Sequence, residues 1–422
     1  MNIVIASTHE FDPRIGGTER ISVILAQNLM RYGHGVFFVA FNKSPFSKPY
    51  TPVVEQIILP NETDLCSEEN IRCFSDFIKD KNIDVILNQD GVSHKSLSFC
   101  AAVKAKTNIK LFTAIHFDPA CSIKAYKSDL SVLDMRSPFL RKIKYYLKQK
   151  ISFKLKDTKK YFSSLYYRLY QECDAVILLS EHFKPAFKEI SGLDDETKLE
   201  IITNPLTLPV PEKLYPKEKQ ILWVGRFNNY QKRPERLVQI WSYLEDRHPD
   251  WSVLFIGDGP SKPQVERLVR ELGLKNIRFE GFSDPVSAYS KSSILCMTST
   301  YEGFGLVLTE AMLYDVVPMA FGSYESVYEI IEDGVTGHII EPFDLKMYAQ
   351  RLESLMIDDD RRKIMSQNAR EYVTDKFDVD KIIKKWLNLF DKYAPASTEH
   401  LPPFPADNQP VMSLSSSLLK YE

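Results

Sequence analysis

Short apolar runs alternate with segments of helical periodicity along most of this 422-residue chain. In the first half, strands are predicted at 2–6, 36–41, 83–87, 109–115 and 174–179. In the second half, they are predicted at 220–224, 251–256, 277–281, 293–298 and 316–320. Segments with apolar residues at every third or fourth position lie between them, beginning with Thr18–Arg31. Strands separated by helices pair in parallel, so the alternation predicts α/β sheets covered by helices on both faces.

A proline-rich stretch interrupts the alternation once. Residues 204–219 contain four prolines, which exclude a regular helix or a central strand there. We therefore predict two Rossmann-like, doubly wound domains at 1–208 and 220–376, joined by a linker at 209–219. Doubly wound sheets bind ligands beyond the carboxyl ends of their strands, so the prediction includes an interdomain cleft. A helix at 377–393 and a flexible tail at 394–422 complete the expected organisation.

Composition restricts the class of protein. The chain has 54 basic and 56 acidic side chains, a balance that argues against a nucleic-acid partner. No run of apolar residues is long enough for a membrane-spanning helix, and the N-terminus is typical of a strand and not of a signal peptide. Six cysteines without a Cys-x-x-Cys pair fit reduced thiols. We expect a soluble protein in the cytoplasm.

One segment departs from the neutral average. Residues 136–168 contain eleven Lys and Arg side chains against one acid, Asp157, interleaved with aromatic and aliphatic residues. Such a helix is a solvated basic face, a surface for an anionic membrane or lipid acceptor or, as the least favoured alternative, a contact for nucleic acid. Peripheral attachment to the cytoplasmic face of a membrane is therefore one of three alternatives for this segment.

The stretch with the most chemical information follows the strand predicted at 293–298. Gly303 and Gly305 permit tight turning before a helix whose N-terminus favours a phosphate. Glu302 lies in the same turn, and Glu310 lies about one helical turn further on among apolar neighbours. A carboxylate among apolar residues is costly without hydrogen bonds, so Glu310 either binds ligand hydroxyls or lies on an exposed helix face.

Cationic and glycine-rich turns follow two other predicted strands. Gly225 and Arg226 end the strand at 220–224, and Lys232 lies six residues beyond Arg226. Arginine can hold a phosphate through two hydrogen bonds, and lysine adds a point charge. Gly16 and Gly17 open the helix after the first strand, where backbone N–H groups could cradle a second phosphate. Taken singly, each feature is also consistent with a surface charge or an ordinary turn.

In order, these motifs resemble one family. Glu302-Gly303-Phe304-Gly305-Leu306 followed by Glu310 is similar to the E-x7-E signature of retaining, GT-B-fold glycosyltransferases of the glycosyltransferase group 1 family. The Gly-Asp-Gly-Pro turn at 257–260 and the run Glu332–Gly337 match the same family, strongly over 220–390 and more loosely over 1–204. The resemblance implies transfer of a sugar from a UDP- or GDP-sugar to a hydroxyl of a glycan, with retention and without a metal or cofactor.

The resemblance also assigns roles to individual residues. It implies a catalytic set of Glu302, His116, Arg226 and Lys232. It implies donor and nucleotide binding by Gly16, Gly17, Gly225, Arg226, Lys232, Gly303, Phe304, Gly305, Leu306 and Glu310. In this family the last helix usually crosses back to the N-terminal domain, which is expected here for 377–393.

The acceptor is less well defined by the sequence. His9 and Asp12 follow the first strand, and Asp118 follows His116, so these three are candidate acceptor contacts. Asp118 precedes Pro119 and is equally typical of a turn. The basic segment 136–168 suggests that the acceptor is a lipid-linked glycan at a membrane face, for instance a precursor of a capsule, O-antigen or lipopolysaccharide.

Two other functions remain open from the sequence. A glycan phosphorylase or a sugar-nucleotide epimerase would use the same fold, and a catalytically inactive glycan-binding module would keep the site without turnover. A metal centre is not expected, because Asp378 and Asp380 precede a predicted helix and are typical of helix capping.

Overall fold

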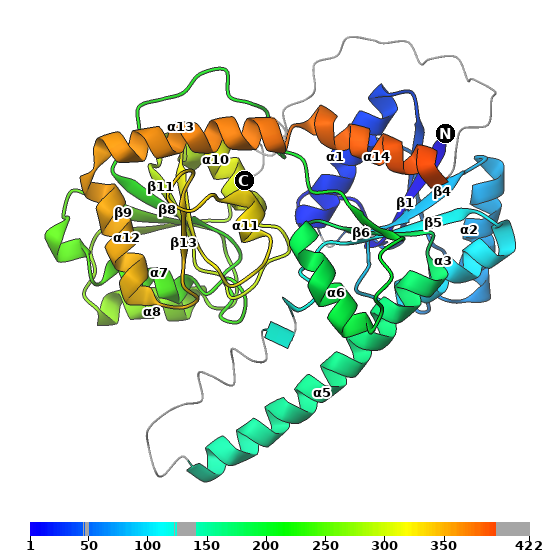
Figure 1. Cartoon of the computed structure of the whole chain (residues 1–422), viewed down its shortest axis with the longest axis horizontal. Coiled ribbons are helices and arrows are strands. Elements are labelled where there is room, and N and C mark those ends of the chain that lie inside the picture. Colours follow the sequence, from blue (N-terminus) through cyan, green and yellow to red (C-terminus); the bar gives the residue numbers. More distant parts are fainter. Residues whose placement is uncertain (45, 47–49, 122, 125–140, 394–422) are drawn as a thin grey trace. The chain divides into compact units, whose positions relative to one another are not determined.

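The computed structural model describes residues 1–44, 46, 50–121, 123–124 and 141–393, apart from the side chains of 141–153 (Figure 1). The chain divides into two compact units. With the gaps just given, unit 1 comprises 1–123, 141–207 and 379–393, and unit 2 comprises Lys124 and 208–378. The predicted tail 394–422 and the first part of the basic segment, 136–140, lie outside the described residues.

The described residues of unit 1 form a seven-stranded parallel sheet in the order β3-β2-β1-β4-β5-β6-β7. The strands are β1 (Asn2–His9), β2 (Gly35–Asn42), β3 (Gln56–Ile58), β4 (Val85–Asn88), β5 (Lys110–Ile115), β6 (Ala175–Leu178) and β7 (Leu199–Ile201). The central strands are rich in Val, Ile, Leu and Phe because helices bury both of their faces. The chain reverses its direction of winding between β1 and β4, which makes this the switch point of the sheet.

Helices cover the sheet of unit 1. They are α1 (Gly17–Arg31), α2 (Glu68–Asp80), α3 (His94–Thr107), α5 (Arg141–Glu172), α6 (Lys184–Ser191) and α14 (Val379–Tyr393), with a short 3₁₀ turn, η2 (Glu181–Phe183). Local capping fixes where several of them begin. The Ser67 hydroxyl accepts a hydrogen bond from the Asn70 N–H at the start of α2, and Ser93 does the same from Ser96 at the start of α3.

Unit 2 repeats the design with a six-stranded parallel sheet in the order β10-β9-β8-β11-β12-β13. Its strands are β8 (Gln220–Val224), β9 (Ser252–Ile256), β10 (Ile277–Gly281), β11 (Ile294–Met297), β12 (Val317–Phe321) and β13 (His338–Ile340). Its helical elements are α7 (Pro234–Trp241), η3 (Glu245–Arg247), α8 (Lys262–Glu271), α9 (Val286–Lys291), α10 (Leu306–Leu313), α11 (Val327–Ile330), α12 (Leu345–Ile357) and α13 (Asp359–Lys376). The switch point of this sheet lies between β8 and β11. The predicted fold class, α/β with two Rossmann-like sheets, is confirmed.

The last helix, α14, packs into the core of unit 1 although it follows unit 2 in sequence. Its Phe390 ring stacks on Phe112 of β5, with ring centroids 6.0 Å apart, and Trp386 is also buried there. The helix begins at Val379 and not at 377, because Phe377 is the C-terminal cap of α13.

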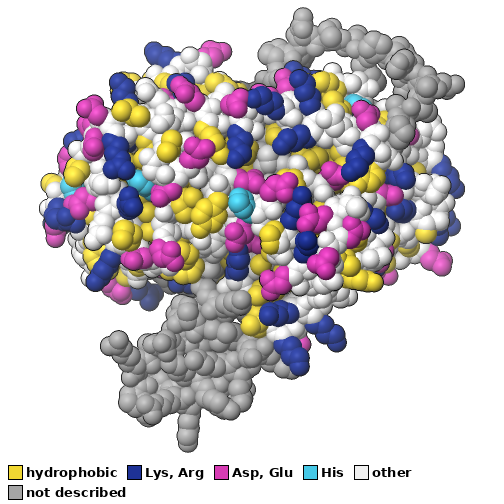
Figure 2. Space-filling model, viewed as in Figure 1, with side chains coloured by type: hydrophobic (Ala, Val, Ile, Leu, Met, Phe, Trp, Pro, Cys, Tyr) yellow, Lys and Arg dark blue, Asp and Glu magenta, His cyan; other side chains and the backbone are white. Residues whose placement is uncertain are grey.

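Three short edge strands, β3, β7 and β13, were not predicted from the sequence. Each has three residues, which is too few for an alternating pattern to be recognised. Among the described residues, no helix has the length and apolar character needed to cross a membrane. On the face shown in Figure 2, acidic and basic side chains are intermingled, as the nearly balanced composition predicts.

Candidate functional site

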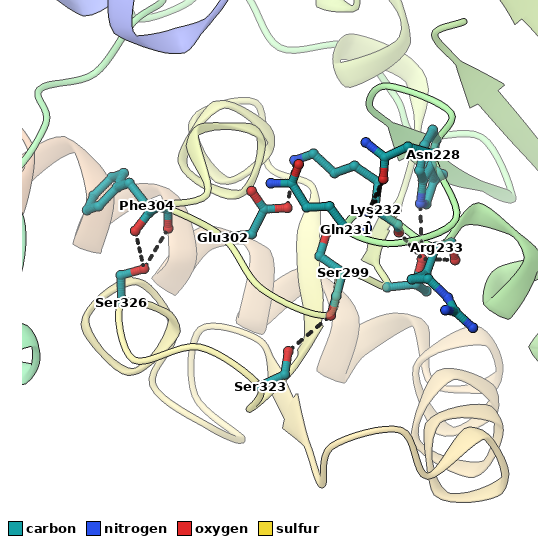
Figure 3. Close-up of polar contacts among 12 residues, drawn as sticks. Asn228, Gln231, Lys232, Arg233, Ser299, Glu302, Phe304, Ser323 and Ser326 are labelled. Carbon is teal, nitrogen blue, oxygen red and sulfur yellow. Dashed lines mark hydrogen bonds and ion pairs between the residues drawn. The ribbon is translucent and has the colours of Figure 1, made fainter. Parts of the chain in front are cut away.

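The switch point of unit 2 brings together the loops that follow β8 and β11. Ligands of doubly wound sheets bind at this place, because the crossover helices leave in opposite directions there. Gly225, Arg226 and Lys232 come from the first loop, and Glu302 to Gly305 come from the second. The residues predicted separately as phosphate ligands and as an acidic turn therefore belong to one edge of one sheet. Figure 3 shows Lys232 of the first loop beside Glu302 of the second.

Two glycines of the neighbouring loop shape the turn after β8. Gly257 has φ of +133°, and a Cβ there would lie 1.9 Å from the Gly225 carbonyl oxygen. Gly259 has φ of +148°, and a Cβ there would lie 2.4 Å from the Phe227 carbonyl oxygen. The Gly225 N–H donates to the Ile256 carbonyl at 3.0 Å. A side chain at either glycine would thus displace the turn that carries Arg226.

The rest of this loop positions Lys232. The Asn228 amide oxygen accepts hydrogen bonds from the backbone N–H groups of Gln231 at 2.9 Å and Lys232 at 2.8 Å. Arg233 has φ of +51°, an uncommon left-handed conformation, and its N–H donates to the Asn228 carbonyl at 3.0 Å. The two loops are also joined directly, because the Thr300 N–H donates to the Gln231 carbonyl at 2.7 Å.

Lys232 and Glu302 form the central ion pair of this edge. The ammonium nitrogen lies 2.6 Å from Oε1 of Glu302, and the two side chains are 18% and 6% exposed. A charge-assisted hydrogen bond of this length in a largely dry environment is strong. Arg226, by contrast, has an exposed side chain and makes no ion pair with a described residue of the chain. The site therefore has one cation already neutralised and a second directed to solvent.

Buried polar groups hold the loop after β11. The Trp223 indole N–H donates to the Thr298 hydroxyl at 3.1 Å, and that hydroxyl donates to the Arg233 carbonyl at 3.0 Å. The buried Arg236 guanidinium donates to the Thr298 carbonyl at 3.0 Å. These hydrogen bonds attach the beginning of the acidic turn, residues 299–305, to the loop after β8 that carries Lys232.

Two serines fix the remainder of the acidic turn. The Ser323 hydroxyl donates to the Ser299 carbonyl at 3.0 Å, and the Ser326 hydroxyl lies 3.1 and 3.0 Å from the carbonyls of Gly303 and Phe304 (Figure 3). Gly305 then takes φ of +103° as the N-terminal cap of α10. The N-terminal N–H groups of α10, beginning at Leu306, consequently lie next to the turn that carries Glu302.

Glu310 lies on the buried side of α10. It is 2% exposed, and Oε2 accepts a hydrogen bond from the Tyr289 hydroxyl of α9 at 2.9 Å. The alternative of an exposed helix face is therefore wrong. Tyr289 was not singled out from the sequence, because nothing in the sequence shows that α9 packs beside α10.

Unit 1 has its own polar cluster at the switch point between β1 and β4. Gly16 caps α1 in an extended conformation, and Gly17 begins the helix. Oε2 of the buried Glu19 lies 3.0 Å from the position of a Cβ on Gly16, so an acidic side chain lies at the helix N-terminus where a phosphate was predicted. Burial raises the pKa of Glu19 above its usual value.

Asp90 is a second acid that sequence reasoning missed. It follows β4, and its Oδ2 accepts hydrogen bonds from the Thr8 backbone N–H and, at 2.5 Å, from the Thr8 hydroxyl. Burial raises its pKa, and the hydrogen bonds from Thr8 oppose that rise. A carboxylate directly after a strand at a switch point was the available signal.

His116 ends β5 beside a small apolar cavity. Its Nε2 lies 2.5 Å from the Gln89 amide oxygen, and burial lowers its pKa to about 4. The cavity is lined by side chains of α1, α14 and the strand ends, among them Ile21, Trp386 and Thr203. The imidazole is therefore neutral at pH 7. His9, the other candidate histidine, has an exposed side chain.

Two of the predicted acceptor contacts have structural roles instead. Asp12 is 0% exposed, and its carboxylate accepts hydrogen bonds from the Arg14 guanidinium at 2.8 Å and the Ser44 hydroxyl at 2.9 Å. Asp118 is equally buried, and its Oδ1 accepts from the Ala120 N–H at 2.8 Å, which is turn chemistry. A carboxylate buried in this way stabilises its loop, so the burial of Asp12 and Asp118 does not support a contact with the acceptor. Within the described ranges, no group of three or more His, Cys, Asp or Glu could hold a metal ion.

Comparisons with known proteins identify the class. The family model for "Glycosyl transferases group 1" matches residues 207–372, and the model for "Glycosyltransferase Family 4" matches 15–208. The chain is thus a two-domain GT-B protein whose two halves each match a glycosyltransferase model. It belongs to the group 1 glycosyltransferases.

The relatives and neighbours agree with this assignment. An uncharacterized glycosyltransferase of Haemophilus influenzae is 25% identical over 89% of this chain and 96% of the relative. A Campylobacter jejuni N-acetylgalactosaminyltransferase that acts on an undecaprenol-linked glycan is 26% identical over 52% of this chain and 60% of that protein. Among solved structures, Anabaena HepE in complex with UDP and glucose has a TM-score of 0.69 at 17% identity, covering 93% of this chain and all of that one (100%). The last likeness shows the fold.

Proposed function

We propose that this protein transfers a sugar from a nucleotide-linked donor to a hydroxyl of a glycan in the synthesis of a cell-surface polysaccharide. The observation that carries the proposal is the pairing of Lys232 with Glu302 at the switch point of unit 2, beside the buried Glu310. Relatives named for transfer to an undecaprenol-linked glycan, for amylovoran biosynthesis and for transfer to poly(ribitol-phosphate) support the same activity.

The donor diphosphate would bind where the cations and amide dipoles of unit 2 converge. Arg226 is free of ion pairs with described residues, and Lys232 needs only to turn from Glu302 to meet a phosphate. The N–H groups at the start of α10 add partial positive charge. These groups stabilise the negative charge that develops on the leaving diphosphate, so the proposed reaction needs no metal ion.

Two carboxylates would hold the rest of the donor. Glu310 would accept hydrogen bonds from the ribose hydroxyls, with Tyr289 fixing its orientation. Glu302 would accept from hydroxyls of the sugar. UDP is the donor nucleotide best supported, because HepE, the structural neighbour at TM-score 0.69, was solved in complex with UDP. GDP stays an alternative in the test below.

We propose a retaining reaction. The acceptor oxygen forms its bond to the anomeric carbon as the bond from that carbon to the phosphate oxygen breaks. The acceptor proton passes to the leaving phosphate oxygen. His116 of unit 1 stays a predicted catalytic residue, and its imidazole is neutral because burial holds its pKa at about 4.

The acceptor would be a lipid-linked glycan, and α5 would meet the membrane. In the described part of this helix, Lys154, Lys156, Lys159 and Lys160 are exposed. Tyr161 and Tyr167 are 42% and 49% exposed, so aromatic and cationic groups share the helix surface. This composition suits the interface of an anionic bilayer. Sedimentation with anionic and with neutral vesicles tests it, and equal absence from both pellets would remove the membrane contact.

The donor site is tested by replacing Glu310. Glu310→Gln keeps an acceptor for Tyr289 but loses the charge that would hold the ribose. Hydrogen bonds to a charged group contribute about 1.5–3 kcal/mol, so we expect UDP affinity to fall by about tenfold or more. Calorimetry with UDP and GDP measures it. Glu271→Gln, an exposed acid at the end of α8, is the matched control. Unchanged affinity in the Glu310 variant would reject this ribose site.

A further inference from the structure

The loop after β12 contains a buried tyrosine that none of the interactions described above uses. Tyr324 is 1% exposed, and its hydroxyl has no hydrogen-bond partner among the described residues. A hydroxyl buried without a partner costs free energy. The neighbouring serines of this loop do form hydrogen bonds. The cost at Tyr324 would be removed if its hydroxyl met a hydrogen-bond acceptor in another state of the protein.

The neighbours of Tyr324 in sequence place it against the acidic turn. Ser323 and Ser326, on either side of it, both donate to carbonyls of the turn between Ser299 and Phe304 (Figure 3). The Tyr324 hydroxyl itself lies 3.4 Å from the position of a Cβ on Gly305. Its surroundings are therefore the turn that carries Glu302. Burial and, to a smaller extent, the negative charge of Glu302 raise the pKa of this hydroxyl well above the usual value. The hydroxyl consequently stays protonated and able to donate.

The Glu302 carboxylate, in turn, needs a hydrogen-bond donor. Its side chain is 6% exposed, and Lys232 is its ion-pair partner in this structure. The proposed function requires Lys232 to turn to the donor diphosphate. A carboxylate that is largely buried and has lost its cation is strongly destabilised unless another donor replaces it. Tyr324, in the adjoining loop after β12, is a buried donor whose hydroxyl has no hydrogen-bond partner among the described residues.

We propose that Tyr324 is a positioning residue whose hydroxyl donates to the Glu302 carboxylate when Lys232 leaves it for the diphosphate. The inference rests on the proposed function for the movement of Lys232. The exchange itself, Lys232 for Tyr324 on one carboxylate, can be examined without any donor. The hydroxyl keeps its proton throughout, and no covalent bond changes.

The first experiment is a double-mutant cycle on thermal stability in the absence of nucleotide. In the wild-type background, Tyr324→Phe removes an unpartnered hydroxyl, so the melting temperature should stay the same or rise slightly. In the Lys232→Met background, Glu302 already lacks its cation and should be bonded to Tyr324. There, Tyr324→Phe should lower the melting temperature by about 3 °C or more.

A second buried tyrosine provides the control for this cycle. The Tyr348 hydroxyl donates to the Met319 carbonyl at 2.7 Å, so Tyr348→Phe should lower the melting temperature equally in both backgrounds. The proposal is overturned if Tyr324→Phe behaves like this control. It is also overturned if Tyr324→Phe has no effect in either background.

The second experiment measures UDP binding and also decides the matter if Lys232→Met does not fold. Tyr324→Phe should weaken UDP binding by about tenfold, because the liberated Glu302 then has no donor, whereas Tyr348→Phe should leave UDP affinity unchanged. Equal affinity in wild type and Tyr324→Phe would contradict the role. If the wild-type protein binds no UDP, the proposed function fails, while the nucleotide-free cycle still reports on the Tyr324–Glu302 bond.

Discussion

At the scale of single residues, the ion pair between Lys232 and Glu302 has two effects. It neutralises a carboxylate that is 6% exposed, and it keeps an ammonium group ready at the edge where a diphosphate would bind. Removing one partner of a buried pair costs more than the pair contributes, because the other charge is left without compensation. The pair thus links the stability of unit 2 to its proposed chemistry.

Lys232→Met should therefore lower the free energy of unfolding by about 3 kcal/mol. The matched control is Lys219→Met, which removes the exposed ion pair with Asp250, where both side chains are more than half exposed (52% and 56%). That change should leave the free energy of unfolding nearly unchanged, because both charges stay in water when the pair is removed. Urea denaturation of the three proteins gives both values. Equal losses would show that Glu302 is not as isolated from solvent as the structure has it.

His116 predicts a specific loss of stability in acid. Burial lowers its pKa from 6.5 to about 4 in the folded protein, so the unfolded chain binds the proton first as the pH falls. Stability is therefore complete above 6.5 and decreases as the pH falls toward 4. The slope from this one group approaches about 1.4 kcal/mol per pH unit. His116→Gln should remove that part of the slope between these pH values, as measured by urea midpoints. Parallel curves for the two proteins would contradict the assignment.

At the scale of elements, the order of the parallel strands and their crossover helices determines where the loops of the candidate site lie. Both sheets reverse their winding once, and the loops at each reversal carry the polar residues described above. The chain fixes the geometry of these loops with backbone features, including the positive φ of Gly257 and Gly305. The positive φ of these glycines thus helps to determine the shape of the loops.

Gly257→Ala tests this dependence. A Cβ at Gly257 would lie 1.9 Å from the Gly225 carbonyl oxygen, so the turn must move as well as accept the strained φ. We expect a loss of about 3 kcal/mol or more in unfolding free energy. Gly273→Ala has φ of +67° and nothing within 4 Å, so it should cost only about 1 kcal/mol. If the two variants were equally stable in urea, the close approach of the loops would be wrong.

At the scale of the whole molecule, the sequence predicted the fold class well and the packing poorly. Long apolar runs such as β2 and β5 were found because helices bury both of their faces. The edge strands β3, β7 and β13 were missed because three residues are too few to show the alternation of apolar and polar side chains that indicates a strand. The motifs singled out Glu302 and Glu310, whose roles in a donor site stay predictions. The sequence did not single out Tyr289, Glu19 and Asp90. Their roles depend on which elements pack together, and Asp12 was misjudged for the same reason, since its burial by Arg14 and Ser44 is a tertiary property.

The central claim is that unit 2 binds the diphosphate of a nucleotide sugar at the edge where Lys232 meets Glu302. Calorimetric titration of the full chain with UDP, in the presence of EDTA, tests it most directly. We predict saturable binding by the wild-type protein and by Lys219→Met, and affinity at least tenfold weaker in Lys232→Met. Failure of the wild-type protein to bind either UDP or GDP, or equal affinity of the Lys232 variant, would contradict the claim.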